Sequence, residues 1–308
     1  MTTVADIINQ TREEVLDDTD PQKYLWSDTE LIHLFNRCYN ELIKQAMLIT
    51  DQSTTSITQI KVLSNLGIYP IDSRIIQINT VRLEKNPNFS PLNKTTEQRL
   101  DNTVTNWRNE TGTPREFAPG AASGYLSIYP KYDNVGEILG ASDITFVSAT
   151  KTISQATGDF TQFTVGDSVN ISGTILNNGY VTVATVSTHS MTVVEALVDE
   201  SNVSAIIRKV RDTLLMTVNR LPTVRWTTAD ITNATPITEI REDHCDGFMD
   251  GIAKRAFLKP DTYTYYPQKA EYHRGLWEEW KTLCKRDIIL LHKPDKSRVP
   301  RSGSSIYY

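Results

Sequence analysis

The sequence predicts an α+β protein, with helices near both ends of the chain and strands between them. Two observations lead to this fold class. Near each end, apolar residues recur at steps of three and four, the period of a helix that buries one face. Between residues 53 and 210 the period shortens, and turn residues separate short runs rich in β-branched side chains, which is typical of strands.

The clearest helix is predicted over residues 23–47. Ser27 and Glu30 form an S-x-x-E capping box, in which each side chain accepts a hydrogen bond from the other residue's amide. Trp26 and Leu31 stand at the two positions of a hydrophobic staple. One apolar stripe then runs along the helix, through Leu31, Phe35, Tyr39, Leu42 and Ala46. A helix of this kind packs onto other helices, so the stripe predicts a bundle.

A shorter helix is predicted over residues 3–16, with Thr3 as its cap. The turn that follows, residues 17–21, carries three carboxylates and invites comparison with a calcium loop. An EF-hand loop needs Gly at its sixth position and Glu at its twelfth. Counted from Asp18, these positions hold Lys23 and Thr29, so an EF-hand loop is excluded.

Strands are predicted over residues 57–62, 68–71, 75–83 and 125–129, with a short helix at about 95–107. From about Ala141 to Val210 the composition changes. Residues 144–209 hold only three basic and five acidic side chains, and the segment is rich in Thr, Ser and Val. Strands are predicted here at 144–147, 163–165, 168–171, 180–186, 191–194 and 203–207, with a tight hairpin at Asn177-Asn178-Gly179. Short strands at this spacing predict a small sandwich or barrel.

A further strand is predicted at 214–218, and two helices follow, over about 242–258 and 267–291. Gly247 and Gly251 lie four residues apart in the first, where each glycine costs about 1 kcal/mol relative to alanine. Their spacing clears a strip of the helix for a close neighbour, for which we expect a second subunit. The competing interpretation is a surface stretch without a packing role. Trp277 and Trp280 in the second helix are expected to pack in the core, and a ligand cage and the same subunit interface are the alternatives.

Composition limits the function classes. The net charge is −5, with ten acidic and four basic side chains in residues 1–51, so a concentrated nucleic-acid-binding face is not expected. The sequence contains no apolar run of membrane-spanning length. A signal peptide is not expected, because the N-terminus lacks a basic flank and a long apolar run. Cys38, Cys245 and Cys284 are expected to be buried free thiols.

Several stretches in a fixed order resemble the head-to-tail adaptor (connector, or head completion) proteins of tailed phages. The first is the acidic turn with W-S-D-x-E-L, residues 16–31. It is followed by YLSIYP at 125–130, NRLP at 219–222 and KRAF at 254–257. The resemblance covers roughly the first 140 and the last 100 residues. The stretch from 163 to 183 interrupts this pattern and resembles a β-module of phage structural proteins.

The resemblance implies a helical bundle with a small antiparallel sheet, formed by residues 1–140 and 211–291. Residues 141–210 are then an inserted all-β domain, and 292–308 an extended C-terminal tail. It further implies a structural virion protein at the neck, assembled in the host cytoplasm. A homo-oligomeric, dodecameric ring would dock on the portal protein and extend the channel. Double-stranded DNA would pass without sequence-specific binding. A tail nozzle, tail fibre or tailspike would attach below.

The C-terminal tail has the chemistry for docking on the portal. It combines positive charge, prolines that favour extended backbone, and terminal aromatic anchors, which suit a peptide that orders when it binds. The predicted portal-docking residues are Lys293, Lys296, Arg298, Arg301, Tyr307 and Tyr308. The competing interpretation is a solvated tail without a partner.

Two other functions remain open. One is a tail or fibre attachment protein that acts mainly through the β-domain. The other is a metal-dependent nuclease that uses Asp243, Asp246 and Asp250, which share one predicted helix face. A solvated face, with Asp250 paired to Lys254, competes with the nuclease interpretation. No zinc spacing, nucleophile elbow, P-loop or dinucleotide motif occurs, so neither an enzymatic activity nor a cofactor is predicted.

Overall fold

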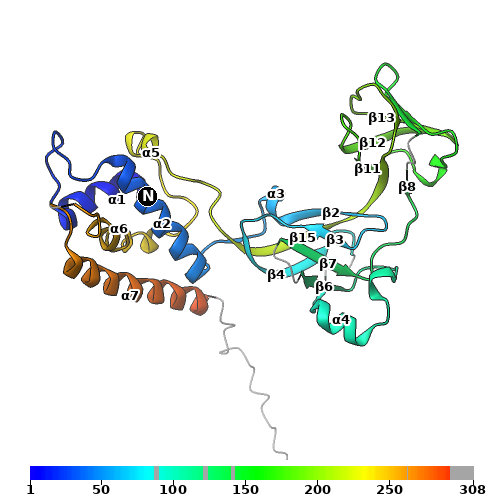
Figure 1. Cartoon of the computed structure of the whole chain (residues 1–308). Coiled ribbons are helices and arrows are strands. Elements are labelled where there is room, and N and C mark those ends of the chain that lie inside the picture. Colours follow the sequence, from blue (N-terminus) through cyan, green and yellow to red (C-terminus); the bar gives the residue numbers. More distant parts are fainter. Residues whose placement is uncertain (87–89, 121–123, 140–142, 262, 292–308) are drawn as a thin grey trace, which may run out of the picture. The chain divides into compact units, whose positions relative to one another are not determined.

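The chain has a mixed α+β fold, as predicted at the level of fold class. The structure, a computed structural model, describes residues 1–86, 90–120, 124–139, 143–261 and 263–291 (Figure 1). Two compact units divide the chain. One comprises Met1–Thr50 and the chain from Asn219 onward, and the other comprises Asp51–Val218. The predicted boundaries at residues 141 and 210 both fall inside the second unit, and the inserted domain stays a prediction.

The first unit is helical and is built from both ends of the chain. Its main helices are α1 (Val4–Gln10), α2 (Asp28–Ala46), α5 (Thr228–Thr232), α6 (Phe248–Ala256) and α7 (Pro267–Leu291). A π-helix, Thr11–Leu16, continues α1, so the predicted helix over 3–16 is present with a widened second half. The observed α7 matches the predicted range of 267–291.

The start of α2 follows the predicted capping box. The Glu30 amide donates to Ser27 Oγ at 3.3 Å, and the Ser27 amide donates to Glu30 Oε2 at 2.9 Å. These two bonds satisfy amide groups that the first turn of a helix leaves without partners. Thr3 forms an equivalent box with Asp6 at the start of α1.

The apolar stripe of α2 faces α6 and α7, as a bundle requires. Phe35 meets Phe248 with ring centroids 5.1 Å apart in a T-shaped pair, and Phe248 lies 5.9 Å from the ring of Trp277. All three side chains are fully buried. Aromatic side chains bury the largest areas of any residues, so this cluster dominates the packing of the helical unit.

The helix predicted from residue 242 begins later than expected. Residues Glu242–His244 form a single 3-10 turn, and α6 starts at Phe248 after Gly247. Gly247 is poorly suited to a helix interior because of its conformational entropy, and here it stands at the helix boundary. The side chains of Asp243 and Asp250 therefore lie on different elements.

The second unit is organised around β15 (Ile206–Arg220), a long strand with alternating buried positions whose last two residues belong to the helical unit. Along one path, β15 is followed by β11 (Ser168–Ser172), β12 (Gly179–Val186), β13 (Ser190–Val193), β10 (Thr152–Ser154), β9 (Ile144–Val147) and β14 (Glu200–Val203). It also pairs with β2 (Gln59–Leu63), β4 (Ile75–Leu83) and β8 (Glu137–Leu139). Its register is antiparallel to β2, β8 and β11.

A second sheet lies in the same unit, in the order β3 (Ile68–Pro70), β7 (Tyr125–Tyr129), β6 (Glu116–Pro119) and β5 (Asn93–Lys94). The sequence predicts a small antiparallel sheet here, and this detail is wrong for one pair, because β5 and β6 run parallel. Helix α4 (Glu97–Thr103), capped by Thr96, follows β5 along the chain.

Two separate apolar cores support the second unit. One gathers residues between 138 and 207, with Phe146, Phe160 and Ile207 fully buried. The other joins β2, β4 and β15 to the smaller sheet, with Phe117 and Leu214 at its centre. Because β15 supplies residues to both cores, a single continuous strand connects them.

Two local predictions in the 163–183 stretch are wrong. Residues 163–165 form no strand; the chain there leaves a 3-10 turn at Phe160–Gln162. The Asn177-Asn178-Gly179 stretch is no two-residue hairpin, because six residues separate β11 from β12. The buried Asn177 side chain bonds the backbone of Val198, and Asn178 bonds the backbone of Thr174. Both asparagines therefore organise a wider loop.

Candidate functional site

The predicted portal-docking residues, Lys293, Lys296, Arg298, Arg301, Tyr307 and Tyr308, lie outside the described residues. Their role stays a prediction. The other predicted site, at Gly247, Gly251, Trp277 and Trp280, lies within the helical unit.

The two glycines pack against the two tryptophans of the same chain. A Cβ at Gly247 would lie 2.2 Å from the Trp280 ring, and a Cβ at Gly251 would lie 3.0 Å from the Trp277 ring. Gly247, Gly251 and Trp277 are buried, whereas Trp280 is half-buried. The close neighbour expected for the glycines is thus α7, and only Trp280 retains surface that a second subunit could contact.

The carboxylates of the nuclease interpretation do not form one face. Asp243 forms an ion pair with Arg241 in the 3-10 turn, and Asp250 Oδ1 lies 2.7 Å from His273 Nδ1. The predicted Asp250–Lys254 pair is wrong, because the Lys254 ammonium bonds Glu41. In the part of the chain that the structure describes, His, Cys, Asp and Glu side chains form no group of three that could hold a metal ion.

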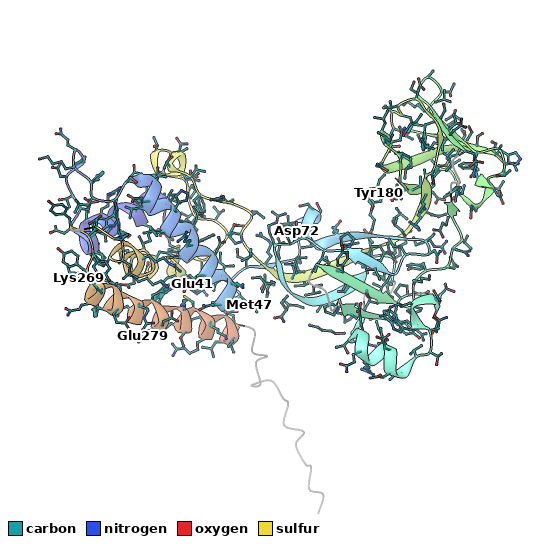
Figure 2. The ribbon with its side chains drawn as sticks, viewed as in Figure 1. Glu41, Met47, Asp72, Tyr180, Lys269 and Glu279 are labelled. Atoms are coloured by element: carbon teal, nitrogen blue, oxygen red, sulfur yellow. The ribbon has the colours of Figure 1, made fainter. Side chains whose placement is uncertain are left out.

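Glu41 is the centre of a charged cluster that local sequence patterns do not predict (labelled in Figure 2). Its carboxylate accepts from Lys281 Nζ at 2.7 Å, Lys254 Nζ at 3.0 Å and Arg255 Nη2 at 2.7 Å. The indole Nε1 of Trp277 donates to the same carboxylate at 3.0 Å. One side chain of α2 therefore joins α6 and α7 by four polar contacts.

The cluster is buried enough for its electrostatics to matter. Burial alone would raise the pKa of Glu41, but hydrogen bonds from Lys281, Trp277, Lys254 and Arg255 outweigh it and lower the pKa to about 2. At Lys254 burial dominates and lowers the ammonium pKa. At Lys281 burial is outweighed by hydrogen bonds to Glu278 and Glu41, and the pKa is raised. The fixed carboxylate neutralises cations that would be costly to bury alone.

A second buried ion pair organises the acidic turn between α1 and α2. Arg12 Nη1 donates to Asp18 Oδ2 at 2.7 Å, and both side chains are almost fully buried. The Asp18 carboxylate also accepts from the amides of Leu25 and Trp26. Asp18, one of the three carboxylates that invited the calcium comparison, therefore stabilises the fold of the turn.

The three cysteines are buried free thiols, as predicted. Burial raises the thiol pKa to about 11 at Cys38, about 12 at Cys245 and about 11 at Cys284. A buried thiol that stays protonated is a poor nucleophile.

Two of the short stretches that carry the adaptor resemblance meet in the helical unit. The indole Nε1 of Trp26, from W-S-D-x-E-L, donates to the Ala256 carbonyl of KRAF at 3.2 Å. The Trp26 and Phe257 rings form a T-shaped pair with centroids 6.2 Å apart. Arg220, from NRLP, bonds Glu239 at 2.7 Å, and its amide bonds the Ile49 carbonyl. These residues hold the N-terminal and C-terminal parts of the unit together.

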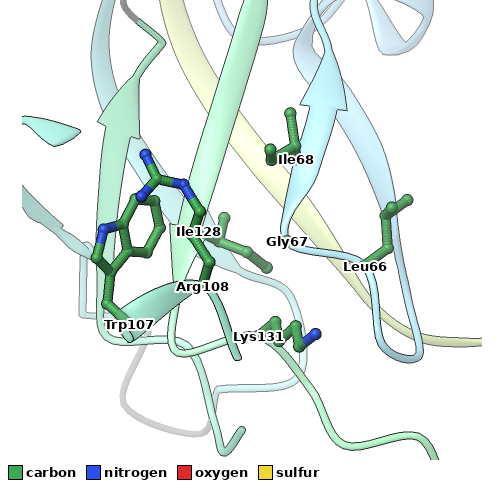
Figure 3. A pocket seen from close by; sticks show the side chains of 7 residues that line it. All are labelled: Leu66, Gly67, Ile68, Trp107, Arg108, Ile128 and Lys131. Atoms are coloured by element: carbon green, nitrogen blue, oxygen red, sulfur yellow. The ribbon is translucent and has the colours of Figure 1, made fainter. Parts of the chain in front are cut away.

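A groove opens on the smaller sheet of the second unit (Figure 3). It has a volume of about 160 Å³. Its lining is mainly apolar, with one cationic side chain from the 3-10 turn Trp107–Asn109 and one from the chain after β7. The lining residues are Leu66, Gly67, Ile68, Trp107, Arg108, Ile128 and Lys131. The Arg108 guanidinium lies over the Trp107 ring at 4.3 Å from its centroid. We call this feature the Trp107 groove.

The loop between β11 and β12 exposes two large apolar side chains. Ile175 is 86% exposed and Leu176 is 56% exposed. Their amides donate to the carboxylate of Glu200, which holds this part of the loop against the strand β14. We call Ile175 and Leu176 the apolar tip.

None of the described helices combines the length and apolar character that a membrane crossing needs. Comparison of the sequence with models of known protein families and with curated proteins gave no match in either case.

Proposed function

We propose that this chain is a structural protein of a tailed-phage virion, a head-to-tail adaptor. Its copies form an oligomeric ring that docks on the portal, extends the DNA channel and receives the tail or fibres. The observation that carries the proposal is the meeting of W-S-D-x-E-L and KRAF through Trp26, Ala256 and Phe257. Short stretches recognised only by their order along the chain have a shared role in packing.

The mechanism of such a protein is assembly. The Glu41 cluster and the aromatic core fix α2, α6 and α7 against one another, so the helical unit can present a surface without rearranging. A preorganised surface loses less entropy when it binds. The net charge of −5 suits a channel that DNA passes through, because affinity for phosphate needs clustered Lys and Arg.

The finer architecture belongs to the same proposal. An adaptor core carries an inserted β-domain, residues 141–210, and the support for a separate module is its own apolar core. We place this module on the outside of the ring, toward tail fibres or a tailspike. Because β15 runs from that core into the next, the module is oriented by a strand within the second unit.

The C-terminal tail provides the test of portal docking. A chain truncated after Leu291 should keep its melting temperature, because it retains every helix and strand that the structure describes. It should fail to join portal-bearing heads. A second variant keeps the tail length and replaces Lys293, Lys296, Arg298 and Arg301 by Gln. If these cations bind the portal, this variant should also fail to join portal-bearing heads, and high salt should weaken docking of the unchanged chain.

Incorporation is measured by binding of the purified protein to portal-bearing heads and by electron microscopy of the necks. Normal ring assembly by the truncated chain would refute tail docking and move the contact to the helices. Immunogold labelling of intact virions tests the location. Label on the fibres and not at the neck would refute the adaptor proposal in favour of fibre attachment.

A further inference from the structure

The apolar tip is held in place by a dedicated set of hydrogen bonds. The amide of Ile175 donates to Glu200 Oε1 at 2.8 Å, and the Asn177 side chain donates to Glu200 Oε2 at 2.7 Å. Asn177 also exchanges hydrogen bonds with the backbone of Val198, at 2.8 and 2.9 Å. The chain thus uses a buried asparagine and a carboxylate to present Ile175 and Leu176 to solvent.

Exposed apolar side chains occur singly on most proteins and need no explanation. Here two lie side by side in sequence, with Val198, 49% exposed, bonded to the same loop. A preorganised apolar projection favours binding, because little conformational freedom remains to be lost. The tip therefore fits a partner with a small apolar recess.

The Trp107 groove provides a recess of this size. A cavity of roughly 150 Å³ holds a benzene molecule, so the groove, at about 160 Å³, has room for a branched aliphatic side chain. Trp107 and Ile128 are buried at its floor, and Ile68, 47% exposed, extends its apolar surface. Figure 3 shows Ile68, Ile128 and Trp107 around the same opening.

The charges beside the two features are opposite in sign. The Glu200 carboxylate accepts hydrogen bonds from the apolar tip itself, and burial there is outweighed by the bonds from Ile175, Asn177 and Leu176, which lower the pKa of this carboxyl group. Arg108 and Lys131 border the groove. Asp101 neutralises Arg108, at 2.6 Å, whereas Lys131 has no ion pair with any carboxylate among the described residues.

We propose that the apolar tip of one copy of this chain docks in the Trp107 groove of a second copy. Leu176 or Ile175 enters the apolar recess, and Glu200 approaches Lys131 at its edge. The tip belongs to the larger sheet and the groove to the smaller one, so the two surfaces are different. Such a heterologous contact leaves one tip and one groove free on every pair, and repetition builds a closed ring or a filament.

This inference rests on the proposed function only for the closed ring; the contact itself can be tested in solution. Two full-length variants are made, Leu176→Cys and Ile68→Cys, with an affinity tag on one so that mixed dimers differ in mass. The three native cysteines are buried, so the introduced thiols react first under mild oxidation. Val165→Cys is the matched control, because Val165 is 69% exposed and precedes β11, whereas the tip follows it.

The proposal predicts several-fold more mixed disulfide from Leu176→Cys with Ile68→Cys than from Val165→Cys with Ile68→Cys. Equal yields in the two mixtures would overturn it. So would a Leu176→Cys chain that links mainly to itself, or to a different virion protein when particles are oxidised. As a second readout, Leu176→Ser should weaken self-association in sedimentation, and Val165→Ser should not.

The two proposals can fail separately. Specific tip-to-groove cross-links in a protein absent from the virion neck would keep the contact and refute the adaptor function. A protein found at the neck whose purified copies give no preferential cross-link would keep the adaptor function and refute this interface.

Discussion

Replacing Glu41 by Gln should destabilise the helical unit by about 3–5 kcal/mol, the usual cost of removing one partner of a buried ion pair. Gln keeps the size of the side chain and leaves an oxygen for the Trp277 indole, but it removes the negative charge. Lys281 and Lys254 then remain as cations with only 4% and 9% of their surface exposed. Lys281 retains Glu278 at 2.8 Å, so the larger loss falls on Lys254.

The lowered pKa of Glu41 gives an independent value for this loss of stability. The pKa of Glu41 is lowered from 4.5 to about 2, and at about 1.4 kcal/mol for each pKa unit this corresponds to about 3 kcal/mol. Because the pKa is lower in the folded protein, this stability is fully present above pH 4.5. It is lost as the pH falls from 4.5 toward 2. The difference between the unchanged protein and Glu41→Gln should therefore shrink over that window.

The assay is urea unfolding followed by circular dichroism at 222 nm, where the helical unit dominates the signal, at pH 7 and at steps down to pH 2.5. With a denaturant slope of about 2 kcal/mol per molar, the midpoint at pH 7 should fall by about 1.5 M or more. Glu278→Gln is the matched control. Its side chain is 59% exposed, and removal of such a surface partner should cost under about 1 kcal/mol. A Glu41→Gln midpoint within the error of this control, or a difference that does not change with pH, would refute the reasoning.

Three further predictions concern the fold. Ser27→Ala should cost about 1 kcal/mol of stability through loss of the cap. Trp26→Ala should cost about 3–5 kcal/mol, because a side chain only 2% exposed is lost. An unchanged melting temperature in either variant would contradict its prediction. Gly247→Ala should cost about 1–3 kcal/mol by overpacking against Trp280. The control, Gly275→Ala on the open face of α7, should stabilise by about 0.5–1 kcal/mol. If both substitutions changed the free energy of unfolding in the same direction, the packing of Gly247 against Trp280 would be contradicted. Replacing residues 51–218 by a short Gly/Ser linker should leave a folded helical unit, because Thr50 and Asn219 are joined by a side-chain hydrogen bond of 3.0 Å; loss of cooperative unfolding would show that the units depend on each other.

Elements with a strong local period could be predicted from the sequence. The helix over 267–291 and the strands over 75–83, 125–129 and 144–147 have the predicted bounds. The caps at Thr3 and Ser27 were also predictable, because a capping box spans only four residues. In each case the residues that determine the element are close together in the sequence.

The charged cluster at Glu41 could not be predicted in this way. Its partners lie 213 to 240 residues away along the chain. Local spacing instead favoured Asp250–Lys254, four residues apart, whereas Asp250 pairs with His273 and Lys254 with Glu41. A helix surface pair gains less than about 0.5 kcal/mol, so a long-range buried partner easily takes its place. The glycines at 247 and 251 show the same limit, because their close neighbour was foreseen but not its identity.

The strand β15 shows how a charged stretch can conceal a continuous element. Two strands were predicted, at 203–207 and 214–218, and Arg208, Lys209, Arg211 and Asp212 interrupt the apolar alternation between them. In the structure the strand continues through these residues, and the cations are paired. Arg208 bonds Glu137, Lys209 bonds Asp167, and Arg211 bonds Asp133.

These ion pairs lie where the strand leaves one apolar core of the second unit and enters the other. Ile207 belongs to the first core and Leu214 to the second, and the charged residues fill the interval. Charged side chains are excluded from a packed core, so a strand that serves two cores must carry them between the two. The paired backbone nevertheless continues, with β11 on residues 206–209 and β2 on residues 210–215. The loop that carries Ile175 and Leu176 is thus attached to a connected sheet and not to a flexible linker, which is the condition for a tip that meets a groove of fixed shape.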